Sequence, residues 1–472
     1  AAESASMGYV GRLKYDYLSK YIIEFSGRYD GNDNFHPDKR WGFFPAVSAV
    51  WMISDENFMQ KLNDKNILNS LKLRASYGET GISDGVTRFG YMALYNQGAM
   101  KEYYNAGNIL NVTFSEGNLV NPLALTWYTR KSFNVGFDFA SLNNRLEGSL
   151  DYFYYKTSGY LMSPNNIYAT TLGKPLPEIT SGSKHRRAGF ELNLRYKEKR
   201  GNWYYEIGGN ISYYNQLWEQ LDSEDLATLK NPYTRQTHEK DYFYSMYLSD
   251  GLFQNKEQIL NSPRPLPSTE TSMGDIKYID ANGDGKIDSN DMRRVGQPSM
   301  PHLNYGFDFR VEYKGWSLSA LFQGTGDRYI AMGQQMQRGD YASVITKFQA
   351  DYWTPENTDA RFPRVTKAGY PNGENNALVT DFFNMNAKYF RLKNLQISYN
   401  LKRDLLKNCN FIQGCRITLS GTNLFTVSDV LDFTDPEAKM IEPDKIEKNL
   451  RSISGASYPV FRTYSLGLNV EF

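Results

Sequence analysis

The chain has 472 residues, with 53 Lys and Arg against 52 Asp and Glu, so its formal net charge at pH 7 is only +1. This balance excludes nucleic-acid binding through a concentrated basic face. Mean hydropathy is −0.58, and no apolar run reaches the roughly 20 residues that a membrane helix needs, so a helical membrane protein is also excluded.

Apolar and polar residues alternate along much of the chain, which is the pattern of β-strands that have one apolar and one polar face. In chain order the alternation predicts strands at 9–18, 20–30, 41–52, 68–79, 129–140, 144–157, 186–198, 202–214, 303–314, 315–325, 387–400, 413–424 and 461–472. Many of them are about 10–13 residues long, whereas strands of soluble proteins usually have about 5–6. A tilted strand that crosses a membrane needs roughly 9–11.

Two architectures use such strands. A soluble β-sandwich buries the apolar face against a second sheet, whereas a membrane β-barrel turns that face to lipid and its polar face to a hydrated lumen. Strand length favours the barrel, as do full charges in mid-strand, such as Arg310 and Glu312. A barrel also accounts for the 36 Tyr and 7 Trp, because these residues gather in girdles at both membrane interfaces. The sequence therefore predicts an all-β, transmembrane antiparallel β-barrel.

The connections between the predicted strands alternate between short and long, as expected for periplasmic turns and extracellular loops. The long ones are 80–128, 158–185, 215–302, 326–386 and 425–460. Two periplasmic connections are of intermediate length, 53–67, which has a helical pattern, and 401–412. Phe472 ends an alternating strand, which is typical of the signal by which barrel-assembly machinery takes up outer-membrane proteins.

The number of predicted strands has a consequence for the whole molecule. Bacterial barrels close with an even number of strands, whereas this chain has thirteen and begins outside. We therefore expect residues 1–472 to form the C-terminal part of a single larger barrel. Two explanations for a start of the chain in an outer loop are then open: a cut in that loop, or a gap at a disordered loop.

Several segments resemble the TonB-linked outer-membrane transporters of the SusC/RagA type. They are Gly11-Arg12 with Tyr15-Asp16-Tyr17 and Lys20-Tyr21, Arg28-Tyr29-Asp30-Gly31, Arg40-Trp41-Gly42-Phe43-Phe44-Pro45, Leu71-Lys72-Leu73-Arg74-Ala75-Ser76-Tyr77-Gly78 with Gly81, Gly274-Asp275-Ile276-Lys277-Tyr278, Gly421-Thr422-Asn423-Leu424-Phe425-Thr426 and Asp435-Pro436-Glu437. The resemblance runs in the family's order from about residue 8 to Phe472. It implies a barrel of about 22 strands, so that about nine strands, the plug domain and the TonB-contacting segment precede this chain.

The resemblance also implies a location, partners and a function. The barrel is expected among the lipids of the bacterial outer membrane, with a SusD-like surface lipoprotein as the lid of its outer mouth. A dimer of such transporter–lipoprotein pairs is a further expectation. TonB would supply energy through the N-terminal part that this chain lacks. The expected function is import of oligomeric nutrients, with glycan oligosaccharides favoured over oligopeptides, and a passive porin or surface adhesin is the alternative.

An outer-membrane barrel hydrolase is a third alternative. Gly81-Ile82-Ser83-Asp84-Gly85 fits the Gly-x-Ser-x-Gly pattern, but that pattern needs a strand–turn–helix context and here it begins a loop. The four histidines, His36, His185, His238 and His302, are scattered without metal-ligand spacing. We therefore predict no catalytic residues and no enzyme activity.

The strongest chemical motif lies in the long extracellular loop region 215–302, at residues 280–291. Numbered as a 12-residue calcium loop, it places Asp280, Asn282, Asp284, Lys286, Asp288 and Asp291 at the ligand positions, with Lys286 offering its backbone carbonyl. Gly285 occupies the sharp turn, and Ile287 is expected to anchor the loop against apolar neighbours. The sequence predicts a structural Ca²⁺, favoured over Mg²⁺, that rigidifies an outer loop, and not a paired helical sensor. The alternative is a turn with incidental acidic residues.

Three weaker motifs remain. Cys409 and Cys415 flank a periplasmic connection, and an oxidising compartment favours a disulfide between them over two free thiols. Residues 184–187, Lys-His-Arg-Arg, begin a strand near the outer rim and form either a solvated basic edge or a contact with anionic lipopolysaccharide. Aromatic pairs in outer loops, such as Tyr352-Trp353, either stack on sugar rings or pack within the loops. No residue is indicated for substrate binding.

Overall fold

The computed structural model of the chain describes residues 5–86, 88–92, 95–97, 103–105, 108–110, 114–116, 123–162, 179–240, 244–263, 270–296, 298, 300–332, 350–365, 375–376, 378–409, 411–437, 452–453 and 460–472. Two compact units are present. One comprises residues 1–191 and 214–241, and the other comprises residues 192–213 and 242–472.

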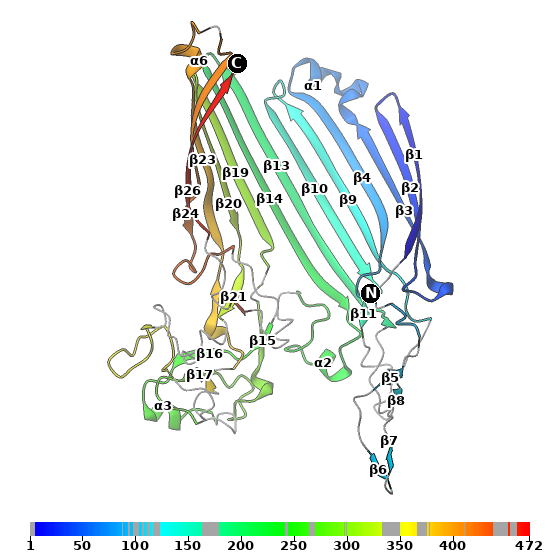
Figure 1. Cartoon of the computed structure of the whole chain (residues 1–472), viewed down its shortest axis with the longest axis vertical. Coiled ribbons are helices and arrows are strands. Elements are labelled where there is room, and N and C mark those ends of the chain that lie inside the picture. The colour runs from blue at the N-terminus through cyan, green and yellow to red at the C-terminus, as the bar shows by residue number, and fades with distance from the viewer. Residues whose placement is uncertain are drawn as a thin grey trace. The chain divides into compact units, whose positions relative to one another are not determined.

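One antiparallel sheet dominates the fold. It contains β1 (Ser6–Tyr17), β2 (Tyr21–Asn32), β3 (Trp41–Met52), β4 (Leu68–Ile82), β9 (Tyr128–Ser141), β10 (Leu146–Ser158), β13 (Lys184–Arg200), β14 (Trp203–Gln220), β19 (Leu303–Tyr313), β20 (Trp316–Thr325), β23 (Tyr389–Asn400), β24 (Gly414–Val427) and β26 (Thr463–Glu471). Figure 1 shows these strands side by side in chain order, and the described neighbour registers are antiparallel. All thirteen overlap the predicted strands, which confirms the predicted strand order.

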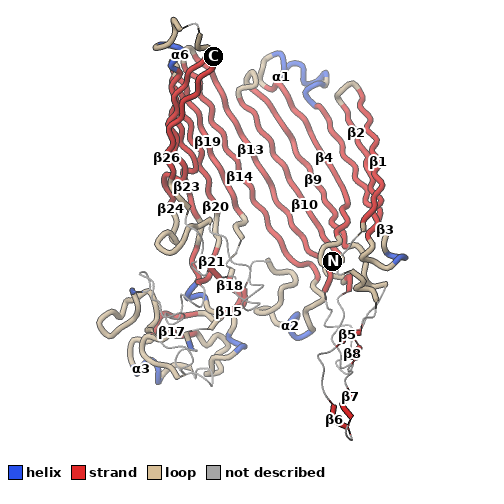
Figure 2. The backbone as a smooth tube through the Cα atoms, in the orientation of Figure 1, coloured by secondary structure: helices blue, strands red, loops and turns tan. Residues whose placement is uncertain are grey.

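Short turns and long connections alternate along this sheet, as predicted (Figure 2). The turn between β19 and β20 consists of Lys314 and Gly315, whose φ values are 45° and 88°. Two residues with positive φ match the right-handed twist of the flanking strands, so this is the turn that a tight hairpin requires. The other end of the sheet carries the long connections, which were predicted to be extracellular.

The remaining elements are short. The helices are η1 (Pro37–Lys39), η2 (Ile53–Asp55), η3 (Asn57–Met59), α1 (Gln60–Asp64), α2 (Leu226–Lys230), α3 (Lys256–Leu260), η5 (Ser289–Asp291), η8 (Asp381–Phe383) and α6 (Leu401–Asp404). The small strands are β5 (Tyr95–Gln97), β6 (Tyr103–Asn105), β7 (Asn108–Leu110), β8 (Phe114–Glu116), β11 (Leu161–Met162), β12 (Ile179–Thr180), β15 (Tyr244–Met246), β16 (Ser249–Leu252), β17 (Ile276–Tyr278), β18 (Arg293–Val295), β21 (Tyr329–Met332), β22 (Asn384–Asn386) and β25 (Ser452–Ile453). Among the described residues, no helix has the length and apolar character to cross a membrane.

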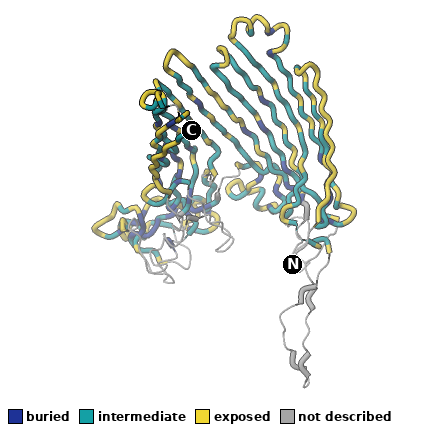
Figure 3. The backbone as a smooth tube through the Cα atoms, turned by 45° about the horizontal axis from the view of Figure 1, so that its top comes forward, coloured by how far each residue is buried: buried dark blue, intermediate teal, exposed yellow. Residues whose placement is uncertain are grey.

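The apolar face of the sheet is its exposed face. Along β2, Tyr21, Ile23 and Phe25 are 42%, 52% and 49% exposed, while the residues between them are less accessible. A soluble protein would bury such a stripe, whereas in a membrane barrel lipid covers it. Figure 3 shows that the buried residues gather mainly in the loops and that few of them lie along the strands. The architecture is therefore the predicted transmembrane β-barrel sheet, and the soluble sandwich is excluded.

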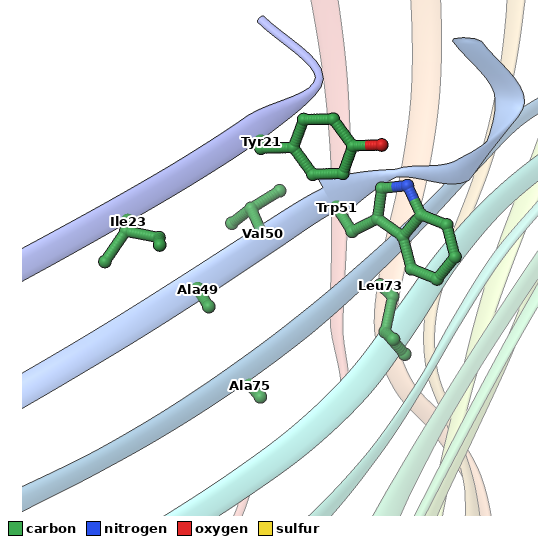
Figure 4. Close-up of a pocket in the computed structure, with 7 residues that line it drawn as sticks. All are labelled: Tyr21, Ile23, Ala49, Val50, Trp51, Leu73 and Ala75. Carbon is green, nitrogen blue, oxygen red and sulfur yellow. The ribbon is translucent and has the colours of Figure 1, made fainter. Parts of the chain in front are cut away.

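One end of this apolar face carries an aromatic anchor. Tyr21 and Trp51 lie with ring centroids 6.5 Å apart, and both donate hydrogen bonds to Glu56, at 2.5 and 3.1 Å. They border a groove of about 320 Å³ whose lining includes Ala49 and Ala75 (Figure 4). Glu56 belongs to the partly helical connection predicted to be periplasmic. Aromatic rings at this level are the girdle expected at a membrane interface.

The main hydrophobic core of the second unit lies in its long loops. Its members come from two stretches, 247–287 and 353–383, and they are Tyr247, Leu252, Ile276, Tyr278, Ile287, Trp353, Phe362 and Phe383. Trp353 is 7% exposed and donates its indole N–H to Gln254 at 3.0 Å. Gly274, at φ +83°, passes so close that an added Cβ would lie 2.4 Å from the Trp353 ring. Trp353 of the Tyr352-Trp353 pair therefore packs within the loops.

The predicted disulfide is not present. Cys409 and Cys415 are both free thiols, and Cys415 is buried. Cys415 lies within β24, where its backbone pairs with Val470 of β26. Cys409 lies in the turn after α6, where its N–H donates to the Leu406 carbonyl at 3.0 Å and its own carbonyl accepts from Lys402 at 2.5 Å. The two residues are thus held by separate contacts in this structure, and a disulfide between them stays a prediction.

Candidate functional site

The polar face of the sheet in the first unit carries a network of charges that span three strands. Arg74 of β4 donates to both oxygens of Asp138 on β9, at 2.9 and 2.7 Å, and also contacts Asp151 of β10 at 3.0 Å. Lys72 lies 3.2 Å from Asp138. Gly136 separates Arg74 from Asp151 in the register, and a Cβ there would lie 2.2 Å from an Asp151 oxygen. The glycine therefore opens the space through which Arg74 reaches across a whole strand.

The second unit repeats this arrangement. Arg195 of β13 contacts Glu206 of β14 and lies 3.4 Å from Asp308 of β19. Gly208 is the register partner of Asp308, and a Cβ at Gly208 would lie 2.6 Å from an Asp308 oxygen. On this face, as in the first unit, charges of both signs neutralise one another through contacts across the strands. Such a surface suits a hydrated passage without a strong net field.

A buried arginine joins three segments of the second unit. Arg391 of β23 is 1% exposed and donates to the Thr426 hydroxyl at 2.8 Å, to Asp435 at 2.5 Å and to Glu437. Glu437 also accepts from Lys393 and from the Tyr389 hydroxyl, both at 2.9 Å. The guanidinium thus joins β23 to β24 and to the Asp-Pro-Glu segment that follows. Arg391 ties together two of the segments on which the family resemblance rests.

The loop core contains a second buried ion pair. Asp275 is fully buried and accepts from Arg364 at 2.7 and 3.1 Å, from the Asn376 amide at 2.9 Å and from the Ser272 N–H at 2.7 Å. Burial raises the pKa of Asp275, and the Arg364 contact opposes that rise. The pair links stretches 89 residues apart in the chain. It fixes the Gly274-Asp275-Ile276-Lys277-Tyr278 segment beside the predicted calcium loop.

The predicted calcium loop has a defined backbone. Asp280 accepts from the N–H groups of Gly283 and Gly285, each at 2.7 Å. Burial disfavours the charged form of Asp280, but these backbone hydrogen bonds outweigh it and lower its pKa. Asp291 is fully buried and accepts three backbone N–H groups at its two oxygens, from residues 281, 282 and 288. Ile287 is 6% exposed in the loop core, as expected of an anchor.

The other predicted ligands of this loop lie at its surface. The Asn282 side-chain oxygen accepts from the Asp284 N–H, and Asp284 accepts from the Lys286 N–H, each at 2.9 Å. Asp288 caps η5 by accepting from the Asn290 N–H at 2.7 Å. Across the described ranges no group of three or more His, Cys, Asp or Glu side chains is arranged to hold a metal. The loop is therefore folded around its own side-chain oxygens, which accept hydrogen bonds from backbone N–H groups of the same loop.

Ser83, the central residue of the hydrolase-like pattern, has a simple contact. Its hydroxyl accepts from the Asn32 amide at 3.1 Å, at the end of β4. β4 is followed here by a turn at Asp84 and Gly85 and not by a helix, so the context that a nucleophile requires is missing.

Comparison with known proteins gives a consistent result. The family model described as "TonB dependent receptor-like, beta-barrel" matches residues 3–424. TonB-dependent receptor P26 of Formosa agariphila is 30% identical over 98% of this chain, and the match covers 46% of that protein. TonB-dependent receptor SusC of Bacteroides thetaiotaomicron is 26% identical over 100% of this chain and 44% of its own length.

Solved structures show the same fold. The RagAB peptide importer in its open-open state matches 100% of this chain and 47% of its own, with 21% identity and a TM-score of 0.74. The chain spans about half the length of the curated relatives it matches. The two curated relatives are named TonB-dependent receptors, and the solved structure is that of a peptide importer. The chain belongs to the TonB-dependent receptor-like β-barrel family, whose members lie in the bacterial outer membrane.

Proposed function

We propose that the chain is the C-terminal part of the barrel of an importer that moves oligomeric nutrients across the outer membrane with energy delivered through TonB. The plug domain and the TonB-contacting segment belong to the preceding part of the whole protein. The observation that supports this most directly is the sheet itself, because its apolar face is exposed and its polar face is lined with paired charges. Family membership adds the TonB-dependent mode of energy supply.

The proposed partner is a SusD-like surface lipoprotein that closes the outer mouth, and two such pairs are proposed to form a dimer. Two features of the second unit support a stable docking platform. Its outer loops have their own core and an ion pair between the fully buried Asp275 and Arg364, whose side chain is 21% exposed. A lid that opens and closes gates access without chemistry, and it needs a rigid surface on the barrel side.

For the cargo we propose glycan oligosaccharides ahead of oligopeptides. The charges described on the polar face neutralise one another in pairs, as in Arg74 with Asp138 and Arg195 with Glu206. A surface of this kind offers hydrogen bonds to a neutral polar solute and little attraction to a charged one. The RagAB importer, which shares the fold, is a peptide importer, so oligopeptides are the rival cargo to test.

The test uses the full-length protein in its own cells. A strain lacking the protein is grown on oligosaccharide or on oligopeptide as the sole nutrient, with and without functional TonB. We expect growth on oligosaccharide to require both the protein and TonB, and a tagged copy to co-purify a surface lipoprotein. Growth that needs the protein but not TonB would establish a passive porin. Normal growth on both nutrients without the protein, with surface attachment lost, would establish an adhesin.

We also propose that residues 280–291 bind a structural Ca²⁺. The supporting observation is the folded cradle, in which Gly285 sits at the turn with φ +79° and Ile287 anchors the loop in the core. Asn282 and Asp284 would supply exposed oxygens, Asp288 a half-buried one, and Lys286 its carbonyl. A bound ion would add charge neutralisation to a loop that holds four aspartates at Asp280, Asp284, Asp288 and Asp291.

Two variants of the full-length protein separate metal binding from loop folding. In Asp284→Asn the backbone contacts of the loop are retained, so we expect weaker terbium luminescence and a smaller calcium-induced rise in melting temperature. In Asp291→Asn a fully buried acceptor of three N–H groups changes, so we expect destabilisation even with calcium removed. Wild-type protein that shows no terbium luminescence and no calcium-dependent melting would refute the site.

A further inference from the structure

The four consecutive residues 184–187 do not form one basic edge, because β13 already begins at Lys184. Neighbouring side chains on a strand point to opposite faces. Lys184 and Arg186 share the face of Phe190, an apolar residue that is 39% exposed. His185 and Arg187 lie on the polar face. There the His185 ring lies 4.9 Å from the Trp218 ring, and Arg187 donates to Gln216 at 2.6 and 2.9 Å.

Strands on both sides of β13 complete an outward basic cluster, which consists of Lys156, Lys184, Arg186 and Glu219. Lys156 of β10 shares its face with Tyr152, which is 45% exposed, and its ammonium lies 2.6 Å from Glu219 of β14. This pair bridges β10 and β14, between which β13 lies in the sheet order. The cluster, together with Leu217, Gln220 and His238, lines a recess of about 400 Å³.

The charges of the outward basic cluster are not balanced. Three cations face one carboxylate, and that carboxylate is already engaged by Lys156. Within the described ranges, the side chains of Lys184 and Arg186 make no hydrogen bond and no salt bridge, and Arg186 acts on Glu219 only through longer-range attraction. Two cations separated by about 7 Å along one strand repel each other unless an anion lies between them. The recess therefore has the charge of an anion site.

The position of the outward basic cluster identifies the source of that anion. Arg186 lies four residues, or about 13 Å, from Phe190 along β13. The cluster thus lies just beyond the apolar band, at the end of the strand next to a long loop. Phosphate groups of membrane lipids lie at this level, immediately outside the hydrocarbon. Arginine binds a phosphate through two parallel hydrogen bonds, and lysine adds a compact charge.

We propose that Lys156, Lys184 and Arg186 bind the phosphate of a phosphorylated glycolipid of the outer leaflet. Basic recesses at a membrane surface recognise lipid head groups in this way. The site faces lipid and not the lumen, so its role is to hold the outer rim of the barrel in the leaflet. This inference rests on the membrane placement of the sheet, and it does not depend on the cargo or on TonB.

The test compares two double variants of the full-length protein purified from native outer membranes. Lys184→Gln with Arg186→Gln removes the outward charges, and His185→Gln with Arg187→Gln is the matched change on the opposite face. Lipopolysaccharide is added to delipidated protein, and retained lipid is measured by native mass spectrometry. We expect about 10- to 30-fold weaker retention for the outward variant and little change for the matched one. Heat-modifiable migration on gels verifies that both variants are folded.

Two further arms identify the ligand. Lipopolysaccharide treated with phosphatase should bind wild-type protein as weakly as the outward variant binds intact lipid. Inorganic phosphate at millimolar concentration should not displace the lipid, since the acyl chains hold it at the barrel surface. Equal lipid retention by all proteins, or full displacement by inorganic phosphate, would overturn the proposal. Nutrient uptake is measured in the same strains, so a failure of the lipid site is distinguished from a failure of import.

Discussion

Arg391→Met tests whether the buried guanidinium holds the segment after β24 against the sheet. The side chain is 1% exposed, and its removal leaves Asp435, which is 14% exposed, without its cationic partner. Breaking a buried pair on one side costs about 3–5 kcal/mol. Glu437 keeps Lys393 at 2.9 Å, so we place the expected cost at the lower end, about 3 kcal/mol. The change should open this segment locally before the sheet unfolds.

Backbone amides provide the assay. The N–H groups of Phe433 and Thr434 donate to the Val430 carbonyl at 2.9 and 2.8 Å, so their exchange with deuterium reports opening of the segment. About 3 kcal/mol corresponds to exchange faster by about 100-fold. Arg310→Met is the matched control, since Arg310 forms an ion pair with Glu312 while 49% exposed. An exposed pair of this kind contributes about 0–1 kcal/mol. Equal exchange in the two variants would refute the reasoning.

Acid should act on the same segment. Burial opposes ionisation of Glu437, but the contacts with Lys393 and Tyr389 and the charge of Arg391 outweigh it and lower its pKa. A carboxyl with a lowered pKa stabilises the folded state above its ordinary pKa, and this stabilisation is lost as pH falls through the lowered value. Exchange at Phe433, corrected for the intrinsic effect of pH, should therefore rise in acid. In Arg391→Met the rise should begin at a higher pH.

Two more outcomes follow from the structure. Gly136→Ala places a Cβ 2.2 Å from an Asp151 oxygen, so it should break the contact between Arg74 and Asp151 and destabilise the barrel by about 1–3 kcal/mol. In the control Gly209→Ala the new Cβ would meet only a carbonyl at 3.6 Å, so the melting temperature of the full-length protein should stay nearly unchanged. Equal melting temperatures of the two variants would contradict the steric argument. In the non-reduced protein, Cys409 should react with a maleimide before the buried Cys415, whereas failure of both to react until reductant is added would restore the disulfide.

The strands were predictable because each has its own alternation, and that signal is local. Their ends were less so. The strand predicted at 202–214 continues to Gln220, because residues past 214 still pair with neighbouring chain, as in the bridge between Trp218 and Thr237. Likewise, the strand predicted from 186 begins at Lys184. Because all four residues 184–187 therefore lie in the strand, their side chains alternate between its two faces. The prediction had treated them as one basic edge.

The buried ion pairs were not predictable, because their partners are far apart in the chain and no periodicity connects them. Arg391 is one more polar residue of an alternating strand, and only the fold brings Asp435 and Glu437 to it. Asp275 and Arg364 lie 89 residues apart. The available signal was indirect, since Asp275 and Asp435 both belong to segments that resemble the family. For the calcium loop the spacing predicted the backbone turn and the anchoring of Ile287, both of which are local.

These observations explain where the protein places its internal contacts. Lipid covers the apolar face of the sheet, so the strands are stabilised by pairing and by the membrane and need no second layer. The polar face faces water, where charges can pair at small cost. Only the loops must exclude water by themselves, and there the structure places its apolar core and the fully buried Asp275. Arg391 lies where the sheet meets these loops, which is why breaking its contacts should loosen the outer end and leave the spanning strands intact.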